Sequence, residues 1–362
     1  LFRSNFLLTW CRSNRANLGL FQVDNLFCMT PQLAFLLNQC VVCLQSNNDH
    51  SAELFLKQAI KLAPKNPDVL RFFGIIEANR RNFDSALAYF QKAHKEAPNN
   101  VFVNSNLGNV FWELKRYEEA LLVYEKAISI DPNYAEAYSN KGNALQGLMR
   151  NDEAIAVYDK AISVDPHYAL AYCNKGNVLQ VLGRFEEAIS AYEQAISINP
   201  NYSQAYANKG STFCKLKNFD AALIAFNHAI SLDPQYAEAY GNKGVALYEH
   251  HRFEEALDAY DAALAIDPQY AEVFANKSRA LRDAKYFEDA LISLQMAIQI
   301  DPNNADFHLD AAILHLKLLQ FSSGWDEYEW RWKSANSSSP KFITNKPAWD
   351  GKKTDKRILI WP

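Results

Sequence analysis

Residues 135–168 read AEAYSNKGNALQGLMRNDEAIAVYDKAISVDPHY, and residues 169–202 repeat the same scheme as ALAYCNKGNVLQVLGRFEEAISAYEQAISINPNY. Each stretch is 34 residues long, and the two align without a gap. The same spacing extends along most of the chain, because prolines stand 34 residues apart at 64, 98, 132, 166, 200, 234, 268 and 302. A fixed period of this length indicates an array of stacked supersecondary units rather than one globular core.

Small and aromatic residues recur at fixed places when each repeat is numbered so that its proline is position 32. Alanine recurs at positions 20 and 27, glycine at position 8 and an aromatic residue at position 24; in residues 135–168 these are Ala154, Ala161, Gly142 and Tyr158. Small residues let two helices approach closely, and a large neighbour fills the space beside the contact. Proline lacks an N–H group and disfavours helix in the residue before it, so a helix is predicted to end there.

This pattern resembles that of the tetratricopeptide-repeat family, which has a large residue at position 4, Gly at 8, Ala at 20, an aromatic at 24, Ala at 27 and Pro at 32. The resemblance implies an all-α fold, a right-handed superhelical solenoid of helix-turn-helix repeats. About nine repeats are expected within residues 29–332, beginning at residues 33, 67, 101, 135, 169, 203, 237, 271 and 305. The end repeats depart from the pattern, with Cys40 and Ala312 at position 8 and Gly324 at position 20, as expected of units with only one neighbour.

Charge and composition argue against several classes of partner and function. The net charge is −4, with 37 basic and 41 acidic residues, which offers no basic field for a nucleic-acid backbone. The chain has no apolar run of about 18 residues, so no membrane-spanning helix and no membrane partner are expected. No histidine has metal-ligand spacing with an acidic or cysteine partner. We therefore predict no metal, no cofactor and no catalytic residue in this chain.

The cysteines allow two interpretations. Cys40 and Cys43 form a C-x-x-C, which in some proteins is a redox or metal pair. They also fit the role of small apolar residues on one face of a helix, and the absence of a second such pair favours that interpretation. The remaining cysteines are scattered along the chain, which suits a reducing cytoplasm.

The two ends of the chain read differently from the repeats. Residues 1–28 precede the first methionine, Met29, and lack the shape of a secretory signal, so we expect a non-native or disordered extension. Residues 333–362 begin with a polar, Ser-rich linker and end in the apolar run Ile358-Leu359-Ile360-Trp361, which reads as the first strand of a truncated C-terminal α/β domain. Both ends are predicted to be poorly ordered and open to limited proteolysis.

Asparagine recurs at position 6, on the helix face that the family resemblance assigns to a concave, peptide-binding groove. An asparagine side chain offers one donor group and one acceptor, which match the N–H and C=O of an extended peptide. The array resembles the asparagine ladder of O-linked N-acetylglucosamine transferases. The alternative is that each asparagine makes a structural hydrogen bond between neighbouring helices. The candidate groove residues are Asn106, Asn140, Asn174, Asn208, Asn242 and Asn276 at position 6, Asn109, Asn143 and Asn177 at position 9, and Trp112, Gln146, Gln180 and Tyr248 at position 12.

Basic residues give no sign of a carboxylate clamp. Chaperone-binding members of the family use lysines or arginines at positions 5 and 2, whereas this chain has residues such as Ser139, Cys173 and Glu136 there. Lysine recurs instead at position 7, as in Lys141 and Lys175. These lysines are expected to pack their stems against the next unit and keep their ammonium groups in water.

Residues 324–332, GWDEYEWRW, hold three of the seven tryptophans. Large aromatics there would serve either as an end cap over the last repeat or as a docking surface for a following domain. With the later Trp349-Asp350-Gly351, this stretch resembles the junction in bacterial repeat proteins whose solenoid precedes a glycosyltransferase-like domain. The resemblance implies that a longer parent protein is a glycosyltransferase.

Three functions therefore compete. The first is a scaffold that binds an extended peptide or a partner protein in the groove. The second is the substrate-recruiting half of a protein or polysaccharide glycosyltransferase, and the third is a structural spacer in an assembly. The repeat array favours the first.

Overall fold

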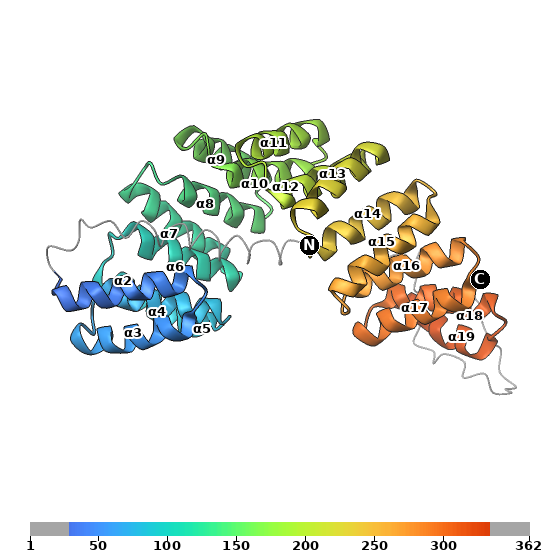
Figure 1. The fold of residues 1–362 in the computed structure, drawn as a ribbon, viewed down its shortest axis with the longest axis horizontal. Helices are drawn as coiled ribbons and strands as arrows, with labels where there is room; N and C mark the ends of the chain where they lie inside the picture. Colours follow the sequence, from blue (N-terminus) through green and yellow to red (C-terminus); the bar gives the residue numbers. More distant parts are fainter. Residues whose placement is uncertain (1–28, 334–362) are drawn as a thin grey trace, which may run out of the picture. The chain divides into compact units, whose positions relative to one another are not determined.

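The computed structural model describes residues 29–333, and every regular element within that range is helical (Figure 1). The first helices of the repeats are α2 (Pro31–Gln45), α4 (Pro67–Asn79), α6 (Val101–Glu113), α8 (Ala135–Gly147), α10 (Ala169–Val181), α12 (Ser203–Lys215), α14 (Ala237–Glu249), α16 (Ala271–Asp283) and α18 (Ala305–Lys317). The second helices are α3 (Asp49–Leu62), α5 (Phe83–Glu96), α7 (Tyr117–Ile130), α9 (Asn151–Val164), α11 (Phe185–Ile198), α13 (Phe219–Leu232), α15 (Phe253–Ile266), α17 (Phe287–Ile300) and α19 (Phe321–Tyr328), which the 3-10 helix η2 (Glu329–Trp332) follows. The predicted all-α fold of repeated helix pairs is confirmed.

The first helix begins two residues before the predicted repeat start at residue 33. Thr30 is its N-cap, and the Thr30 side chain accepts a hydrogen bond from the backbone N–H of Leu33 at 3.3 Å. Pro31 follows at the first helical position, where a missing N–H has no consequence. The local cap therefore sets this boundary, while every later first helix starts at its predicted residue.

The chain divides into two compact units after Asn218. In the first unit, each second helix packs on the first helix of its own pair and on that of the next pair, as α7 does with α6 and α8. In the second unit, α15 packs in the same way on α14 and α16. The first helices of successive repeats also contact one another, α4 to α6 to α8 to α10 to α12 in the first unit and α14 to α16 in the second. Within each unit the first helices therefore form one shared face, called the first-helix face below.

Of the segments predicted to differ from the repeats, residues 1–28 and 333–362, all but Lys333 lie outside the described residues. Their boundaries and their predicted disorder, proteolysis and truncated α/β domain stay predictions. Among residues 29–333, no helix has the length and apolarity needed to cross a membrane.

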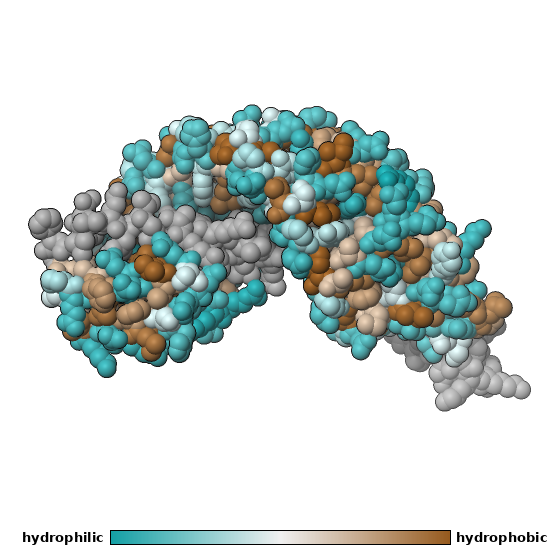
Figure 2. Space-filling view, viewed as in Figure 1, coloured by the Kyte–Doolittle hydropathy of each residue, from teal (hydrophilic) through white to brown (hydrophobic). Residues whose placement is uncertain are grey.

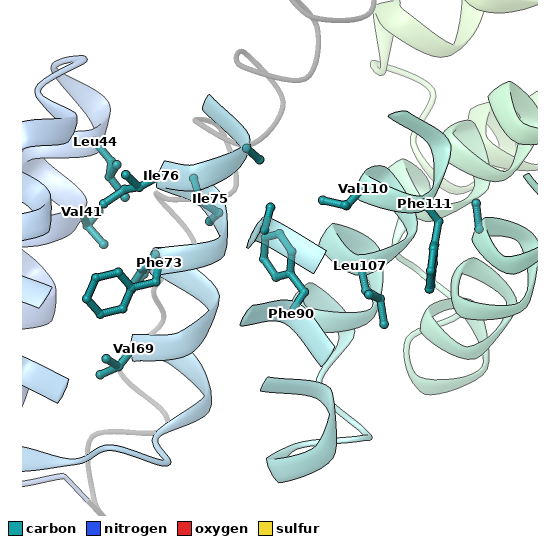
Figure 3. Close-up of a cluster of buried hydrophobic side chains, with 14 of the residues drawn as sticks. Val41, Leu44, Val69, Phe73, Ile75, Ile76, Phe90, Leu107, Val110 and Phe111 are labelled. Atoms are coloured by element: carbon teal, nitrogen blue, oxygen red, sulfur yellow. The ribbon is translucent and has the colours of Figure 1, made fainter. Parts of the chain in front are cut away.

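Glycine at position 8 is explained by the aromatic ring at position 24 of the same repeat. A Cβ atom built on Gly142 would lie 2.5 Å from Cε1 of Tyr158, and one on Gly74 would lie 2.8 Å from the ring of Phe90. Tyr158 and Phe90 are fully buried, so neither ring has room to move aside. Ala154, at position 20, is also fully buried. In the N-terminal repeats Phe90 lies between Ile75 and Leu107 in one continuous apolar cluster (Figure 3).

The junction between repeats combines proline with an aspartate turn. Asp131, next to Pro132, accepts a hydrogen bond at its Oδ1 from the backbone N–H of Asn133 at 2.9 Å. Asp165 does the same with the N–H of His167 at 2.9 Å. Such turns hold the backbone after the helix has ended, which complements the helix-stopping effect of proline. Hydrophilic side chains cover much of the visible surface around these turns and helices, with scattered apolar patches (Figure 2).

Candidate functional site

In six successive repeats, the first helix carries an asparagine at the same helical turn. Asn106, Asn140, Asn174, Asn208, Asn242 and Asn276 lie on α6, α8, α10, α12, α14 and α16, respectively. Asn106 and Asn140 are buried, and the other four are half-buried. Because buried polar groups are almost always hydrogen-bonded, these amide groups need partners in the protein, in water or in a ligand.

The asparagines at position 9 bind the buried tyrosines at position 24. The hydroxyl of Tyr124 donates to Oδ1 of Asn109 at 2.7 Å, and the hydroxyl of Tyr158 donates to Oδ1 of Asn143 at 2.6 Å. Tyr192 makes the same bond to Asn177 at 2.9 Å. Burial raises the pKa of Tyr158, so its hydroxyl keeps its proton and acts as the donor. Sequence reasoning treated these tyrosines only as packing residues.

The asparagines at position 6 connect neighbouring first helices. Nδ2 of Asn140 donates to Oδ1 of Asn109 at 3.1 Å, and Nδ2 of Asn208 donates to Oδ1 of Asn177 at 2.8 Å. Nδ2 of Asn174 donates to the hydroxyl of Ser139 at 3.4 Å. The Nδ2 groups of these three amides therefore make structural hydrogen bonds between neighbouring helices, which was the alternative to ligand binding. Ligand contact by their Oδ1 ends stays a prediction.

The predicted residues at position 12 also make contacts between repeats. Nε1 of Trp112 donates to the backbone carbonyl of Asn143 at 3.2 Å. The hydroxyl of Tyr248 donates to Oδ2 of Asp283 at 2.6 Å, and Oε1 of Gln180 lies 3.4 Å from the hydroxyl of Tyr192 within one repeat. Gln146 is half-buried on α8. Within each unit the predicted residues thus lie on the first helices, and several of them bond neighbouring repeats or helices to one another.

The chemistry of the first-helix face changes from amides to charges within the second unit. Position 9 is Arg279 in the repeat that begins at residue 271, and position 6 of the next repeat is Asp310. Arg279 Nε donates to Asp310 Oδ2 at 3.1 Å, so an ion pair makes the connection between repeats that the amides make earlier. Arg279 Nη1 also donates to Oδ1 of Asn276 at 3.3 Å.

The lysines at position 7 pair with carboxylates on the preceding second helix. Nζ of Lys141 lies 2.8 Å from Glu125, Nζ of Lys175 lies 2.6 Å from Asp159, and Lys209 and Lys277 make equivalent pairs with Glu193 and Asp261. The carboxylates are more than half exposed, so each pair contributes little stability. These lysines are accordingly engaged with neighbouring repeats and are poor candidates for ligand contact.

The described part of the chain shows no group of three or more His, Cys, Asp or Glu side chains placed to hold a metal ion. Cys40 and Cys43 are both free thiols, and burial raises the pKa of Cys40 to about 12. A thiol that stays protonated is a poor nucleophile and a poor metal ligand. The geometry therefore favours the packing interpretation of this C-x-x-C.

The last described residues pack on α18. The ring of Trp330 stacks on His308 with centroids 3.9 Å apart and planes 3° from parallel. His308 Nδ1 also lies 2.5 Å from Glu327 Oε2. These contacts support the end-cap interpretation for this part of residues 324–332, although Trp325 is 57% exposed.

Family models match most of the span from residue 45 to residue 305. A model described as TPR repeat matches residues 108–148 and 150–183. One model described as tetratricopeptide repeat matches residues 169–202. A second model with the same description matches residues 45–101, 207–271 and 242–305. No curated protein matches the chain.

Several solved structures are similar to the chain. YrrB, whose description is a TPR protein with an unusual peptide-binding site, is 28% identical over 54% of this chain and 97% of its own, with a TM-score of 0.42. The Cut9–Hcn1 hetero-tetramer of the APC/C is 19% identical over 86% of this chain and 62% of its own, with a TM-score of 0.56. A tetratricopeptide repeat protein from Parabacteroides merdae ATCC 43184 is 18% identical over 70% of this chain and 100% of its own, also with a TM-score of 0.56. The last two likenesses show the fold.

Proposed function

The chain belongs to the tetratricopeptide-repeat family, and from that premise we propose that its first-helix face binds an extended segment of a partner protein. The repeat fold supports a protein-interaction scaffold in general, because the stacked helix pairs within each unit build a continuous face. The proposal includes a reducing cytoplasmic setting, which suits the four free cysteines among the described residues.

One observation carries the finer proposal of an extended peptide. Within residues 29–333, the Oδ1 atoms of Asn140, Asn174 and Asn208 accept no hydrogen bond from another residue, and none of them is a buried atom without a partner. Each repeat in this stretch therefore offers one open amide oxygen. A series of identical acceptors at the repeat spacing suits a ligand with recurring donors, which the backbone of a peptide provides.

Replacing Asn174 and Asn208 together by alanine tests this proposal. We expect the double variant to lose about 0.5–1.5 kcal/mol of stability for each internal hydrogen bond removed. We also expect its affinity for a peptide, selected by display on the intact chain, to fall about tenfold or more, since two rungs of the ladder are lost. The unfolding midpoint and the peptide affinity are measured on the same samples.

The matched control is Asn227→Ala, which changes an exposed asparagine on α13. It should leave both measurements within error. A large loss of stability with unchanged affinity would return the position-6 asparagines to a purely structural role. A chain for which display selects no peptide would behave as the spacer considered from the sequence.

The resemblance of residues 324–362 to a junction with a glycosyltransferase-like domain stays a prediction about a longer parent protein. The structure describes residues 324–333 of that stretch, and contacts such as the stacking of Trp330 on His308 serve the end of the repeat array.

A further inference from the structure

The buried tyrosine hydroxyls at position 24 determine which way the neighbouring amides face. Tyr124 and Tyr158 are fully buried, and the only acceptor each hydroxyl has among the described residues is the amide of Asn109 or Asn143. A buried hydroxyl that lacked an acceptor for its proton would be strongly unfavourable. The amide must therefore turn Oδ1, and not Nδ2, toward the tyrosine.

The orientation of the position-9 amide also determines how the position-6 amide of the next repeat is turned. Because Oδ1 of Asn109 faces inward, Asn140 contacts it with a donor, and the 3.1 Å bond comes from Nδ2 of Asn140. Tyr192, Asn177 and Asn208 repeat the arrangement, with bonds of 2.9 and 2.8 Å to the shared Oδ1 of Asn177. The Tyr192 hydroxyl also lies 3.4 Å from Oε1 of Gln180, and its shorter bond is the one to Asn177. A hydroxyl buried between the helices thus fixes the orientation of two amides on the first-helix face.

Each bonded pair of a position-9 and a position-6 asparagine, called a rung below, has two polar atoms that these bonds do not use. For the pair of Asn177 and Asn208, both half-buried, these atoms are Nδ2 of Asn177 and Oδ1 of Asn208. Neither atom makes a hydrogen bond within residues 29–333, and neither is shut off from solvent. The rung therefore presents a donor from one repeat beside an acceptor from the next repeat.

The order of the two atoms is the same in the two pairs that share this bond, whereas Asn174 donates to Ser139 and makes no such bond to Asn143. The donor belongs to position 9 of the N-terminal repeat, and the acceptor belongs to position 6 of the C-terminal repeat, as in the pair of Asn109 and Asn140. In an extended peptide, one residue presents its N–H and its C=O to the same side, with the N–H nearer the peptide N-terminus. An N–H that meets the acceptor and a C=O that meets the donor place the peptide N-terminus toward the C-terminal repeats.

We propose that Tyr124, Tyr158 and Tyr192 are positioning residues that give the amide ladder a direction, so that a bound peptide runs antiparallel to the order of the repeats. This inference rests on the proposed peptide-binding function and adds the direction of the ligand to it. The tyrosines never touch the peptide; they act through the amides of position 9.

The direction can be measured with a synthetic peptide, because the ladder recognises backbone groups. The probe is the dodecapeptide (Ser-Ala)6, carrying a nitroxide at its N-terminus or at its C-terminus and titrated to millimolar concentration. An extended chain of this length spans roughly 40 Å, which is enough to cover several rungs. The N-terminal nitroxide should broaden the methyl NMR signals of Ala205 and Ala207 on α12, and the C-terminal nitroxide should broaden those of Leu107 on α6.

The variant that tests the tyrosines is Tyr124→Phe with Tyr158→Phe and Tyr192→Phe. Phenylalanine occurs at position 24 in the native chain as Phe90 and Phe226, so the fold tolerates it. We expect the directional preference to disappear, the affinity for the probe to fall about three- to tenfold, and the side-chain amide signals of Asn177 and Asn208 to shift and broaden.

Tyr260→Phe is the matched control. Tyr260 is buried beside Gly244 as the other tyrosines are beside their glycines, but position 9 of its repeat is Val245, which has no amide. It should lose a buried hydroxyl without any change in peptide direction or affinity. A probe that binds in the opposite direction, or a triple variant that keeps the wild-type direction, would overturn the inference and leave peptide binding intact. A probe that does not bind at all would overturn the proposed function, and the direction with it.

Discussion

Replacing Tyr158 by alanine is expected to lower the free energy of unfolding by about 3–5 kcal/mol. The side chain is fully buried, and its ring fills the space that Gly142 leaves open. Removing the ring leaves a cavity between α8 and α9, which are helices of one pair. The change also removes the donor that holds Oδ1 of Asn143 at 2.6 Å. Equilibrium denaturation followed by circular dichroism measures the loss.

Tyr286→Ala is the control for this change, because the Tyr286 side chain is 58% exposed. It should alter stability by no more than about 0.5 kcal/mol. If Tyr158→Ala proved no more destabilising than Tyr286→Ala, the ring would not be the packing element that the structure indicates.

The steric rule that links positions 8 and 24 could be predicted from the sequence in principle. Glycine stands at position 8 wherever position 24 is a buried aromatic, as in Gly142 and Tyr158. In the repeats where position 24 is Leu56 or Leu294, position 8 is Cys40 or Ser278 instead. The fold depends on such pairs of residues within one repeat, and the pairs recur every 34 residues. The helical class and the 34-residue spacing of the helix pairs could therefore be predicted from the sequence.

The turn between the two helices of each repeat could not be read from the sequence. Position 15 has a positive φ in each of the nine repeats among the described residues, from 56° at Lys217 to 75° at Gly183. Gly183 is the only glycine among these nine residues. Lysine, arginine, methionine, leucine, asparagine and histidine occupy the others, although an L-residue pays about 1–2 kcal/mol to adopt this conformation. Packing of the helix pair enforces the turn, and no residue type signals it.

The row of asparagines at position 6 was also predicted, with hydrogen bonds between neighbouring helices as one of two alternatives, but the partners of those bonds were not predicted. Whether an amide faces a neighbour or the solvent depends on side-chain geometry that the 34-residue spacing does not contain. One signal was present in the sequence: Asn109, Asn143 and Asn177 occur in repeats whose position 24 is tyrosine, and Ser211 occurs where position 24 is Phe226. The repeat with Tyr260 is the exception, because its position 9 is Val245. A hydroxyl and an amide that occur together indicate a bond between them.

The change to an ion pair in the second unit follows the same geometry with different residues. Arg279 and Asp310 are separated by 31 residues, as are Asn109 and Asn140. The backbone thus brings position 9 of one repeat and position 6 of the next together, and the side chains decide whether the connection is neutral or charged. A partner that follows the first-helix face of the second unit meets a different chemistry from one bound to α6, α8, α10 and α12.

Replacing Gly142 by serine is expected to destabilise the chain by about 1–3 kcal/mol, because even its Cβ would lie 2.5 Å from the buried ring of Tyr158. The loss should appear although serine favours a helix more than glycine does. Gly241→Ser on α14 is the comparison, since the nearest atom to a Cβ there is Cγ2 of Val273 at 3.1 Å, a milder contact that a shift of a few tenths of an ångström relieves. It should destabilise the chain less than Gly142→Ser does.

The double variant Gly142→Ser with Tyr158→Leu copies the native pair of Ser278 and Leu294, in which the serine hydroxyl donates to the carbonyl of Ala290 at 2.7 Å. In the double variant the corresponding carbonyl is that of Ala154. We expect the two changes together to destabilise less than the sum of the single changes, by about 0.5–3 kcal/mol. The free energy of unfolding is measured by denaturation for the wild type, the two single variants and the double variant. If the two single losses simply added up in the double variant, positions 8 and 24 would be independent, and the ring of Tyr158 would not be the reason for glycine at position 142.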